Sequence, residues 1–179
     1  MNPIDELKTE HRAGEESLRI LEGICKRVEA AGCVDAPEDV ERLLEFFAVF
    51  VDTCHHGKEE ELLFPALERE GVSRRGGPIG VMLSEHVSGR APIAGMRQAL
   101  TDATAGRDGA EEALVRHARG YAGLLQQHIS KEDNVLFRIA DERLPDGVKA
   151  DLLRGFERIE QEKVGDGRHE AFHRMLEEL

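Results

Sequence analysis

Apolar residues recur along this chain at the three- and four-residue spacing of α-helices, and no run of five residues alternates as a surface strand would. Asn2-Pro3 has the form of a helix start, with a capping side chain and a proline in the first turn. Breaks rich in glycine and proline separate the periodic segments. The pattern predicts an all-α protein with helices at about 3–31, 35–70, 79–103 and 110–142, a shorter helix that ends at about residue 163, and a terminal helix from about residue 168.

Four of these predicted helices are long, and their connections are short. Such a pattern favours an antiparallel up-down-up-down four-helix bundle. The break at Leu144-Pro145-Asp146-Gly147 precedes two shorter helices. We therefore expect a bundle domain over residues 1–143 and a C-terminal helical extension over residues 144–179 that packs on it.

The chain repeats itself once. Thr9-Glu10-His11 resembles Ser84-Glu85-His86, and the run H-H-G-K-E-E-E-L-L-F from His55 resembles H-I-S-K-E-D-N-V-L-F from His128. Each half thus contains one histidine, a gap of just over 40 residues, and then His-x-x-x-Glu. A doubled two-helix unit predicts a site that the two halves share about a pseudo-twofold axis.

Four histidines of the repeat lie on apolar helix faces: His11, His55, His86 and His128. A single histidine on such a face is usually structural, but Glu59 and Glu132 each follow a face histidine by four residues and so share its buried side. A buried carboxylate without a cation is very unfavourable. The six side chains together predict two divalent metal ions with both carboxylates bridging them.

His55 and His56 compete for one of these positions. His56 has Asp52 and Glu60 four residues away on either side, which gives it a polar face, and the repeat aligns His55 with His128. We therefore assign His55 as the ligand and expect His56 on the surface or beside the ligands.

Two further residues are candidates for the surroundings of the metals. Glu15, four residues after His11, is either a seventh ligand or a partner of Arg90 in an ion pair. Tyr121 lies two turns before His128 on the same face, where it is either a neighbour of the metals or a core tyrosine.

Composition narrows the class of protein. Imidazole with carboxylate suits iron, manganese or zinc, and Cys25, Cys33 and Cys54 lack a metal-binding spacing, as expected of reduced cytoplasmic thiols. The formal net charge of -12 argues against nucleic acid or an anionic membrane as a partner. No segment is typical of a signal peptide or of a membrane span.

The run His169-Glu170-Ala171-Phe172-His173 matches the H-E-x-x-H motif of zinc proteases. A catalytic zinc needs a third protein ligand, usually downstream, and only six residues follow His173. We expect instead a solvated helix that covers one end of the bundle.

Four motifs in order carry a resemblance: E-H near the N-terminus, H-H-x-K-E-E-x-L-L-F-P, G-x-M-L-x-E-H-x-x-G-R and H-I-x-K-E-D-x-V-L-F. From Met1 to about Glu142, the chain resembles the bacterial hemerythrin-like, HHE cation-binding family. The resemblance implies a non-haem di-iron centre with an oxo, hydroxo or water bridge, in which manganese or zinc could substitute. By residue, it implies as ligands His11, His55, Glu59, His86, His128 and Glu132.

The family handles dioxygen, nitric oxide, peroxide or iron, so the resemblance implies a sensor or binding protein for such a small ligand. A di-iron oxidoreductase, of the peroxidase or ferroxidase type, is the alternative, and an iron-responsive stability switch is a third hypothesis. Oxygen-carrying members have a second histidine where this chain has Arg90, which disfavours reversible oxygen carriage. The pattern is compatible with a monomer or a homodimer and leaves open whether the protein is an enzyme.

Overall fold

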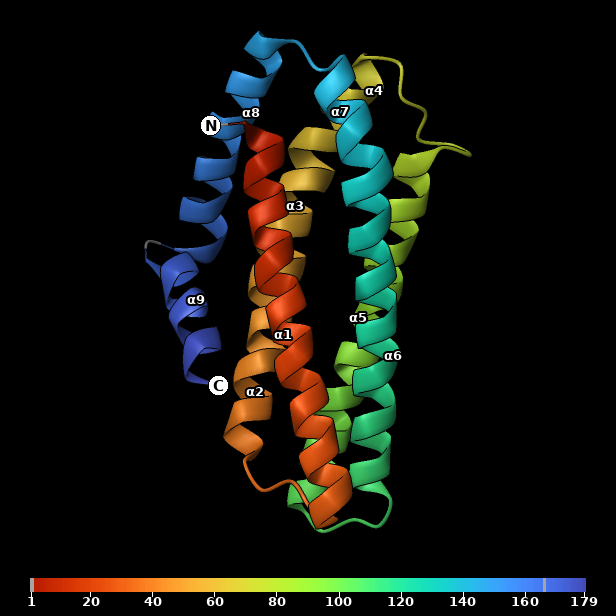
Figure 1. Cartoon of the computed structure of the whole chain (residues 1–179), viewed down its shortest axis with the longest axis vertical. Helices are drawn as coiled ribbons and strands as arrows, with labels where there is room; N and C mark the ends of the chain where they lie inside the picture. Colours follow the sequence, from red (N-terminus) through yellow and green to blue (C-terminus); the bar gives the residue numbers. More distant parts are fainter. Residues whose placement is uncertain (1, 166) are drawn as a thin grey trace.

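The computed structural model describes residues 2–165 and 167–179 and contains helices but no strand within them. The prediction of an all-α fold is confirmed. In Figure 1 the long helices lie side by side along the long axis of the molecule and are joined by short connections. Their bounds are α1 (Pro3–Ala31), α2 (Pro37–Phe46), η1 (Phe47–His55), α3 (His56–Lys58), η2 (Glu59–Leu63), α4 (Phe64–Arg69), α5 (Pro78–Thr104), α6 (Ala110–Lys131), η3 (Glu132–Leu136) and α7 (Phe137–Arg143).

The segments α2 to α4 follow one another without a break and form the second long helix, and α6 to α7 form the fourth. The η segments within them are π-helical, with a wider turn than an α-helix. Glu59 begins η2 and Glu132 begins η3, so the same irregularity occurs at the equivalent place in both halves of the repeat. Such turns rotate the side chains that follow them around the helix axis.

The ends of α1 are set by local sequence. The Asn2 side chain accepts a hydrogen bond from the backbone N–H of Ile4, and Pro3 occupies the first turn. The helix ends at Gly32, whose φ of 68° is left-handed and whose N–H bonds to the carbonyl of Val28. These signals explain why the predicted helix of about 3–31 agrees with the observed one.

A C-terminal segment of three elements follows the bundle: α8 (Asp146–Ile159), η4 (Glu160–Val164) and α9 (Arg168–Glu178). Figure 1 shows α8 and α9 running beside α1 and α2. Phe172 of α9 packs edge-on against Phe46 and Phe50. The expected cap on one end of the bundle is therefore wrong, because the apolar side of α9 instead covers the flank of the second long helix.

Among the described residues, the apolar core consists of two clusters, separated along the helices by the histidines and glutamates of the repeat. One contains Phe46, Phe47 and Phe50 with facing residues of α1, α5 and α6. The other contains Leu63, Phe64 and Phe137 with Ile4 and Leu7 of α1. The polar residues thus lie between two dry layers. No helix among the described residues is long and apolar enough to cross a membrane.

Candidate metal centre

The four histidines of the repeat meet in pairs at the middle of the bundle. His11 Nε2 and His55 Nε2 lie 3.1 Å apart, and His86 Nε2 and His128 Nε2 lie 3.2 Å apart. All four side chains are buried. Each pair comes from one helical hairpin, so each hairpin brings its two histidines to one level.

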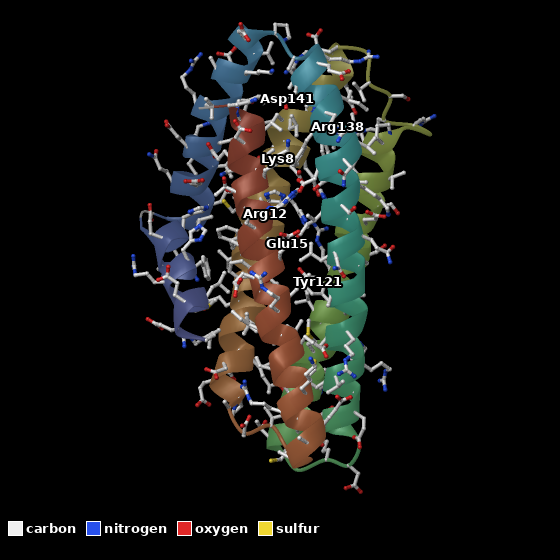
Figure 2. The ribbon with its side chains drawn as sticks, in the orientation of Figure 1. Lys8, Arg12, Glu15, Tyr121, Arg138 and Asp141 are labelled. Atoms are coloured by element: carbon white, nitrogen blue, oxygen red, sulfur yellow. The ribbon has the colours of Figure 1, made fainter. Side chains whose placement is uncertain are left out.

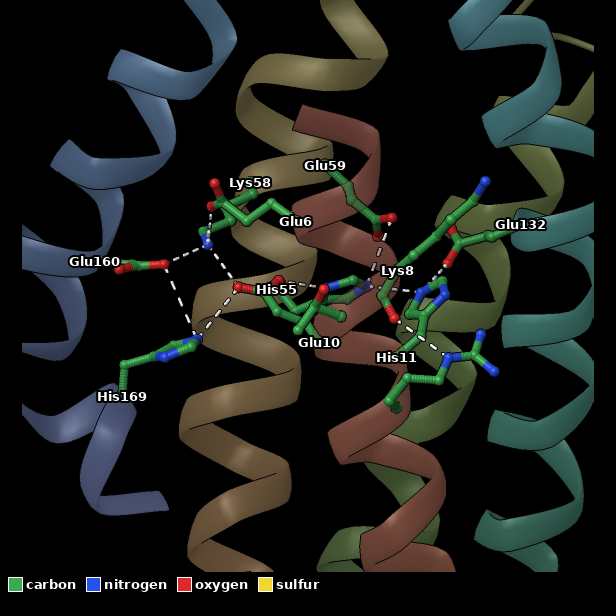
Figure 3. Close-up of polar contacts among 12 residues, drawn as sticks. Glu6, Lys8, Glu10, His11, His55, Lys58, Glu59, Glu132, Glu160 and His169 are labelled. Carbon is green, nitrogen blue, oxygen red and sulfur yellow. Dashed lines mark hydrogen bonds and ion pairs between the residues drawn. The ribbon is translucent and has the colours of Figure 1, made fainter. Parts of the chain in front are cut away.

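Glu59 and Glu132 lie between the two pairs and are completely buried. Glu132 Oε2 is 3.2 Å from Nε2 of both His11 and His128. Glu59 Oε1 is 3.6 Å from His55 Nε2, and its Oε2 is 3.4 Å from His86 Nε2. Figure 3 shows both carboxylates directed toward His11 and His55. Each carboxylate therefore reaches both histidine pairs.

Three of the four oxygens of these carboxylates have no hydrogen-bond partner among the described residues: both of Glu59 and Oε1 of Glu132. Ligand atoms held about 2.1 Å from one metal ion stand roughly 3.4 Å apart in a tetrahedral arrangement. The nitrogen and oxygen atoms here lie 3.1 to 3.6 Å apart. Two groups of side chains bring their possible ligand atoms within 4.8 Å of one another. The first group is His11, His55, Glu59 and Glu132, and the second is Glu59, His86, His128 and Glu132. The residues therefore fit a pair of metal ions.

The carboxylates strongly affect the protonation of the histidines. Burial alone would lower the pKa of His11, but its hydrogen bonds to Asp133 and Glu132 outweigh burial and raise the pKa to about 10. The pKa of His128 is raised to about 9, because Glu132 outweighs burial in the same way. Burial would raise the pKa of Glu132, but His128 and His11 hold it well below its usual range. Without a metal, His11 and His128 therefore hold protons that a metal ion would have to displace.

The Nδ1 atom of each histidine donates a hydrogen bond to a further carboxylate. Such partners fix the ring so that Nε2 faces the site. The four pairs are His11–Asp133 at 2.7 Å, His55–Glu10 at 2.7 Å, His86–Glu60 at 2.8 Å and His128–Glu85 at 3.0 Å. These carboxylates are the functional residues that the sequence analysis missed.

A signal for them is present in the motifs. Glu10 and Glu85 each precede a single histidine, and they bind the other histidine of the same hairpin. Glu60 and Asp133 each follow a buried glutamate, and they bind the single histidine of the opposite hairpin. The acidic residue beside each candidate ligand recurs in both halves, so these residues could have been recognised as a second set of functional residues.

The lysine of each repeat binds the carboxylate that holds a histidine. Lys58 Nζ lies 2.5 Å from Glu10 Oε1, and Lys131 Nζ binds Glu85. We call Glu10, His55 and Lys58 the covered half-site, and Glu85, His128 and Lys131 the open half-site. The exposed fraction of the lysine side chain is 0% in the covered half-site and 43% in the open one.

The C-terminal segment causes this difference. Glu160 of η4 binds Lys58 Nζ at 2.5 Å, and Glu6 of α1 binds it at 2.9 Å. His169 Nε2 of α9 lies 3.4 Å from Glu10 Oε1. Figure 3 shows the resulting connection from Glu160 and His169 through Lys58 and Glu10 to His55. The first histidine of the H-E-x-x-H run is thus placed against the covered half-site.

Glu15 and Tyr121 lie apart from the carboxylate–histidine cluster; Figure 2 labels Glu15 on α1 and Tyr121 on α6. The Glu15 side chain is 40% exposed and accepts a hydrogen bond from Arg12 at 2.8 Å. Arg90 binds Asp52 at 3.0 Å, so the alternative pairing of Glu15 with Arg90 is wrong. The Tyr121 ring packs against Phe47 with centroids 4.7 Å apart, and burial raises the pKa of its hydroxyl.

His56 is buried, with 7% of the residue exposed. Of the two positions expected for it, the surface position is therefore wrong, and the observed one is beside the proposed ligands. His56 follows η1, whose wider π-helical turns rotate it from the polar side of an ideal α-helix toward the bundle. Its ring stacks on that of His86, with centroids 3.7 Å apart and planes 10° from parallel.

Comparison with known proteins gives one result. The family model for the hemerythrin HHE cation-binding domain matches residues 2–140. The matched region contains both histidine pairs and both buried glutamates, and it ends before α8 begins. No curated protein and no solved structure gives a significant match.

Proposed function

Because the chain belongs to the hemerythrin HHE cation-binding family, we propose that it is a non-haem di-iron protein that binds dioxygen, nitric oxide or a related small oxidant. The observation that carries the proposal is the pair of completely buried carboxylates, which lie between two histidine pairs with three oxygens unpartnered among the described residues. Imidazole and carboxylate ligands suit iron, and manganese or zinc could substitute.

In this proposal, His11 and His55 would hold one ion and His86 and His128 the other, and Glu59 and Glu132 would be shared between the two. When bound, an iron pair would supply redox chemistry and a place for a small ligand to bind. The acids on the Nδ1 atoms keep the proton on that side of each ring, so that Nε2 faces inward with its lone pair. The binding geometry is thus prepared by the protein.

The surroundings favour a small ligand. A cavity beside the histidines is lined by apolar side chains that include Val51, Leu125 and Ile129, together with Gly14. A Cβ atom at Gly14 would lie only 3.4 Å from Ile129 Cδ1, so a larger residue there would narrow this space. The apolar clusters on either side of the polar layer exclude bulk water from it.

The experiment that tests this function is a measurement of metal content with an optical spectrum before and after oxygen is added to the reduced protein. About two irons per chain and new absorption bands are expected for the wild type. Iron should be lost from His55→Ala and Glu59→Gln. Glu15→Gln is the matched control, because its exposed carboxylate pairs with Arg12, and it should keep its iron.

One zinc ion or no metal, with the same content in His55→Ala, would contradict the proposal. Sustained turnover of hydrogen peroxide or ferrous iron by the loaded protein would instead identify a di-iron oxidoreductase of the peroxidase or ferroxidase type. A stable adduct without turnover would identify a binding or sensing protein.

We also propose that residues 1–143 form the metal-binding domain and that residues 144–179 form an extension to it. The contacts of Glu160 and His169 with the covered half-site support a role of this extension in the centre itself. The proposal includes a cytoplasmic location and either a monomer or a homodimer.

A further inference from the structure

His56 is a buried histidine outside the six proposed ligands. Its Nε2 atom is enclosed and has no hydrogen-bond partner among the described residues. The residue lines the cavity beside the centre, together with His55 and His128. One ring nitrogen of each of His56, His86 and His128 lies within 4.8 Å of the others. A polar atom in this position needs a partner, because burying it unpaired is unfavourable.

The opposite nitrogen of the ring determines what kind of partner fits. His56 Nδ1 lies 3.3 Å from Asp52 Oδ1. Arg90 also binds Asp52, with Nε 3.0 Å from Oδ2 and Nη2 3.0 Å from Oδ1. Between a guanidinium and an imidazole, Asp52 is an ionised acceptor, so Nδ1 is the nitrogen that carries the proton. His56 Nε2 consequently presents a lone pair to the cavity and accepts a hydrogen bond there.

The stacking of His56 on His86 argues against a third imidazole on the same ion. The two planes are 10° from parallel at a separation of 3.7 Å between centroids. Lone pairs lie in their ring planes, so those of two stacked rings do not converge on one point. The arrangement instead fits a small molecule bound beside His86, which donates a proton to His56.

On the basis of the proposed metal centre, we propose that His56 accepts a hydrogen bond from a proton-bearing ligand of the class of hydroxide and hydrogen peroxide. Dioxygen, nitric oxide and azide offer no proton and leave the Nε2 lone pair unpaired. A site built with a buried polar group discriminates against ligands that cannot satisfy it. His56 is thereby a specificity-determining residue, held by Asp52 and Arg90.

The test uses the full chain loaded with iron, with hydrogen peroxide and azide as probes of similar size followed by the optical spectrum. His56→Phe keeps a ring to stack on His86 but has no lone pair, whereas His56→Gln restores an acceptor. For His56→Phe we expect the affinity for hydrogen peroxide to fall about tenfold, the effect of one buried hydrogen bond. The azide affinity and the iron content should stay within about twofold of the wild type. His56→Gln should recover part of the peroxide affinity.

Other outcomes overturn the inference in distinguishable ways. Equal loss of peroxide and azide affinity would show that His56 only packs the site. Loss of iron from both His56 variants would show that His56 is a metal ligand. Absence of iron from the wild type would contradict the proposed metal centre itself, before His56 enters the comparison.

A second variant covers the case in which His56→Phe does not fold. Asp52 is only partly buried, so Asp52→Ala should preserve the bundle while it releases Nδ1. We expect a selective loss of peroxide affinity of about threefold, because either ring nitrogen can then carry the proton. Unchanged peroxide affinity in this variant would overturn the role of His56 as a held acceptor.

Discussion

The covered and open half-sites carry the same three residue types in the same pattern, but only one of them is shielded from water. In the covered half-site, Lys58 is completely buried and bound by three carboxylates, which are Glu6, Glu10 and Glu160. In the open half-site, Lys131 is 43% exposed and binds Glu85. The repeat therefore accounts for which residues meet, whereas the C-terminal segment accounts for how strongly they interact.

The physical consequence concerns the dielectric environment. Burial alone would lower the pKa of Lys58, but Glu10 outweighs burial and raises it, so the ammonium stays charged inside the protein. A charge pair out of water is strongly destabilised when one partner is removed, because the other stays buried and unpaired. An exposed pair contributes little, since water replaces the missing partner. Equivalent substitutions in the two half-sites should therefore have unequal effects.

The largest difference is expected for the lysines. Lys58→Met leaves three carboxylates close together without a cation and should lower the free energy of unfolding by about 3–5 kcal/mol. Lys131→Met should lower it by less than about 1 kcal/mol. Urea unfolding of the metal-free proteins measures both values. Equal losses would show that the C-terminal segment does not shield the covered half-site in solution.

Substitution of the carboxylates that bind the histidine Nδ1 atoms should also have the larger effect in the covered half-site. We expect this difference to be smaller than the one between the lysines. Glu10→Gln removes the charge on His55 Nδ1 and should weaken the binding of one metal ion by about 10- to 100-fold, as substitutions around ligand histidines do. Glu85→Gln should weaken binding less, because Glu85 is partly exposed and water can take its place. Competition with a chelator measures both affinities. A stronger effect of Glu85→Gln would reverse the comparison.

A change of pH tests one histidine ligand of each of the two proposed ions. His11 and His128 have pKa values raised to about 10 and about 9 in the metal-free protein, so both are protonated at pH 7 and must lose protons when metal binds. Metal affinity should therefore increase as the pH rises from 7, by about tenfold per pH unit for each proton displaced. The gain should end at a lower pH for the ion on His128 than for the ion on His11. Calorimetry in buffers with different heats of ionisation measures the released protons, and affinity independent of pH would contradict the raised pKa values.

The smallest effect is expected from the contact that the C-terminal segment adds. Glu160→Gln keeps a hydrogen bond to Lys58 but removes one of the three negative charges that surround the Lys58 ammonium. The loss of interaction energy should be about 1 kcal/mol, which corresponds to roughly fivefold faster release of one ion of the proposed pair. Stopped-flow transfer of metal to a chelator should resolve one accelerated phase and one unchanged phase. Acceleration of both phases would mean that the segment acts on the whole bundle.

The helices and the six polar residues at the centre were predictable for a local reason. Periodicity, Pro3 and Gly32 act within a few residues of one another, and the spacing from His55 to Glu59 lies within one helical turn. The sequence left open whether His56 lies on the surface or beside the ligands, because an ideal α-helix places it on the polar side and the π-helical turn of η1 changes that. Local irregularity of the backbone is decided by packing that the sequence pattern does not contain.

The carboxylates on Nδ1 were missed for a different reason. Glu60 and Asp133 each sit next to a candidate ligand along the chain but bind a histidine on another helix. A motif states which residues share a turn and does not state which helix lies opposite. The burial of Lys58 likewise depends on η4, which follows it by about a hundred residues. Such contacts become visible only when the helices are placed in space.

The crossing of these hydrogen bonds gives the two hairpins a mutual dependence. Asp133 of the second hairpin holds His11 of the first, and Glu60 of the first holds His86 of the second. Each ion in the proposed centre would also take a carboxylate from both hairpins. Neither hairpin alone contains all the ligands of an ion, so the ions would link the two hairpins. Occupancy by metal would then report that the two parts of the chain have come together, and its loss would free them to separate.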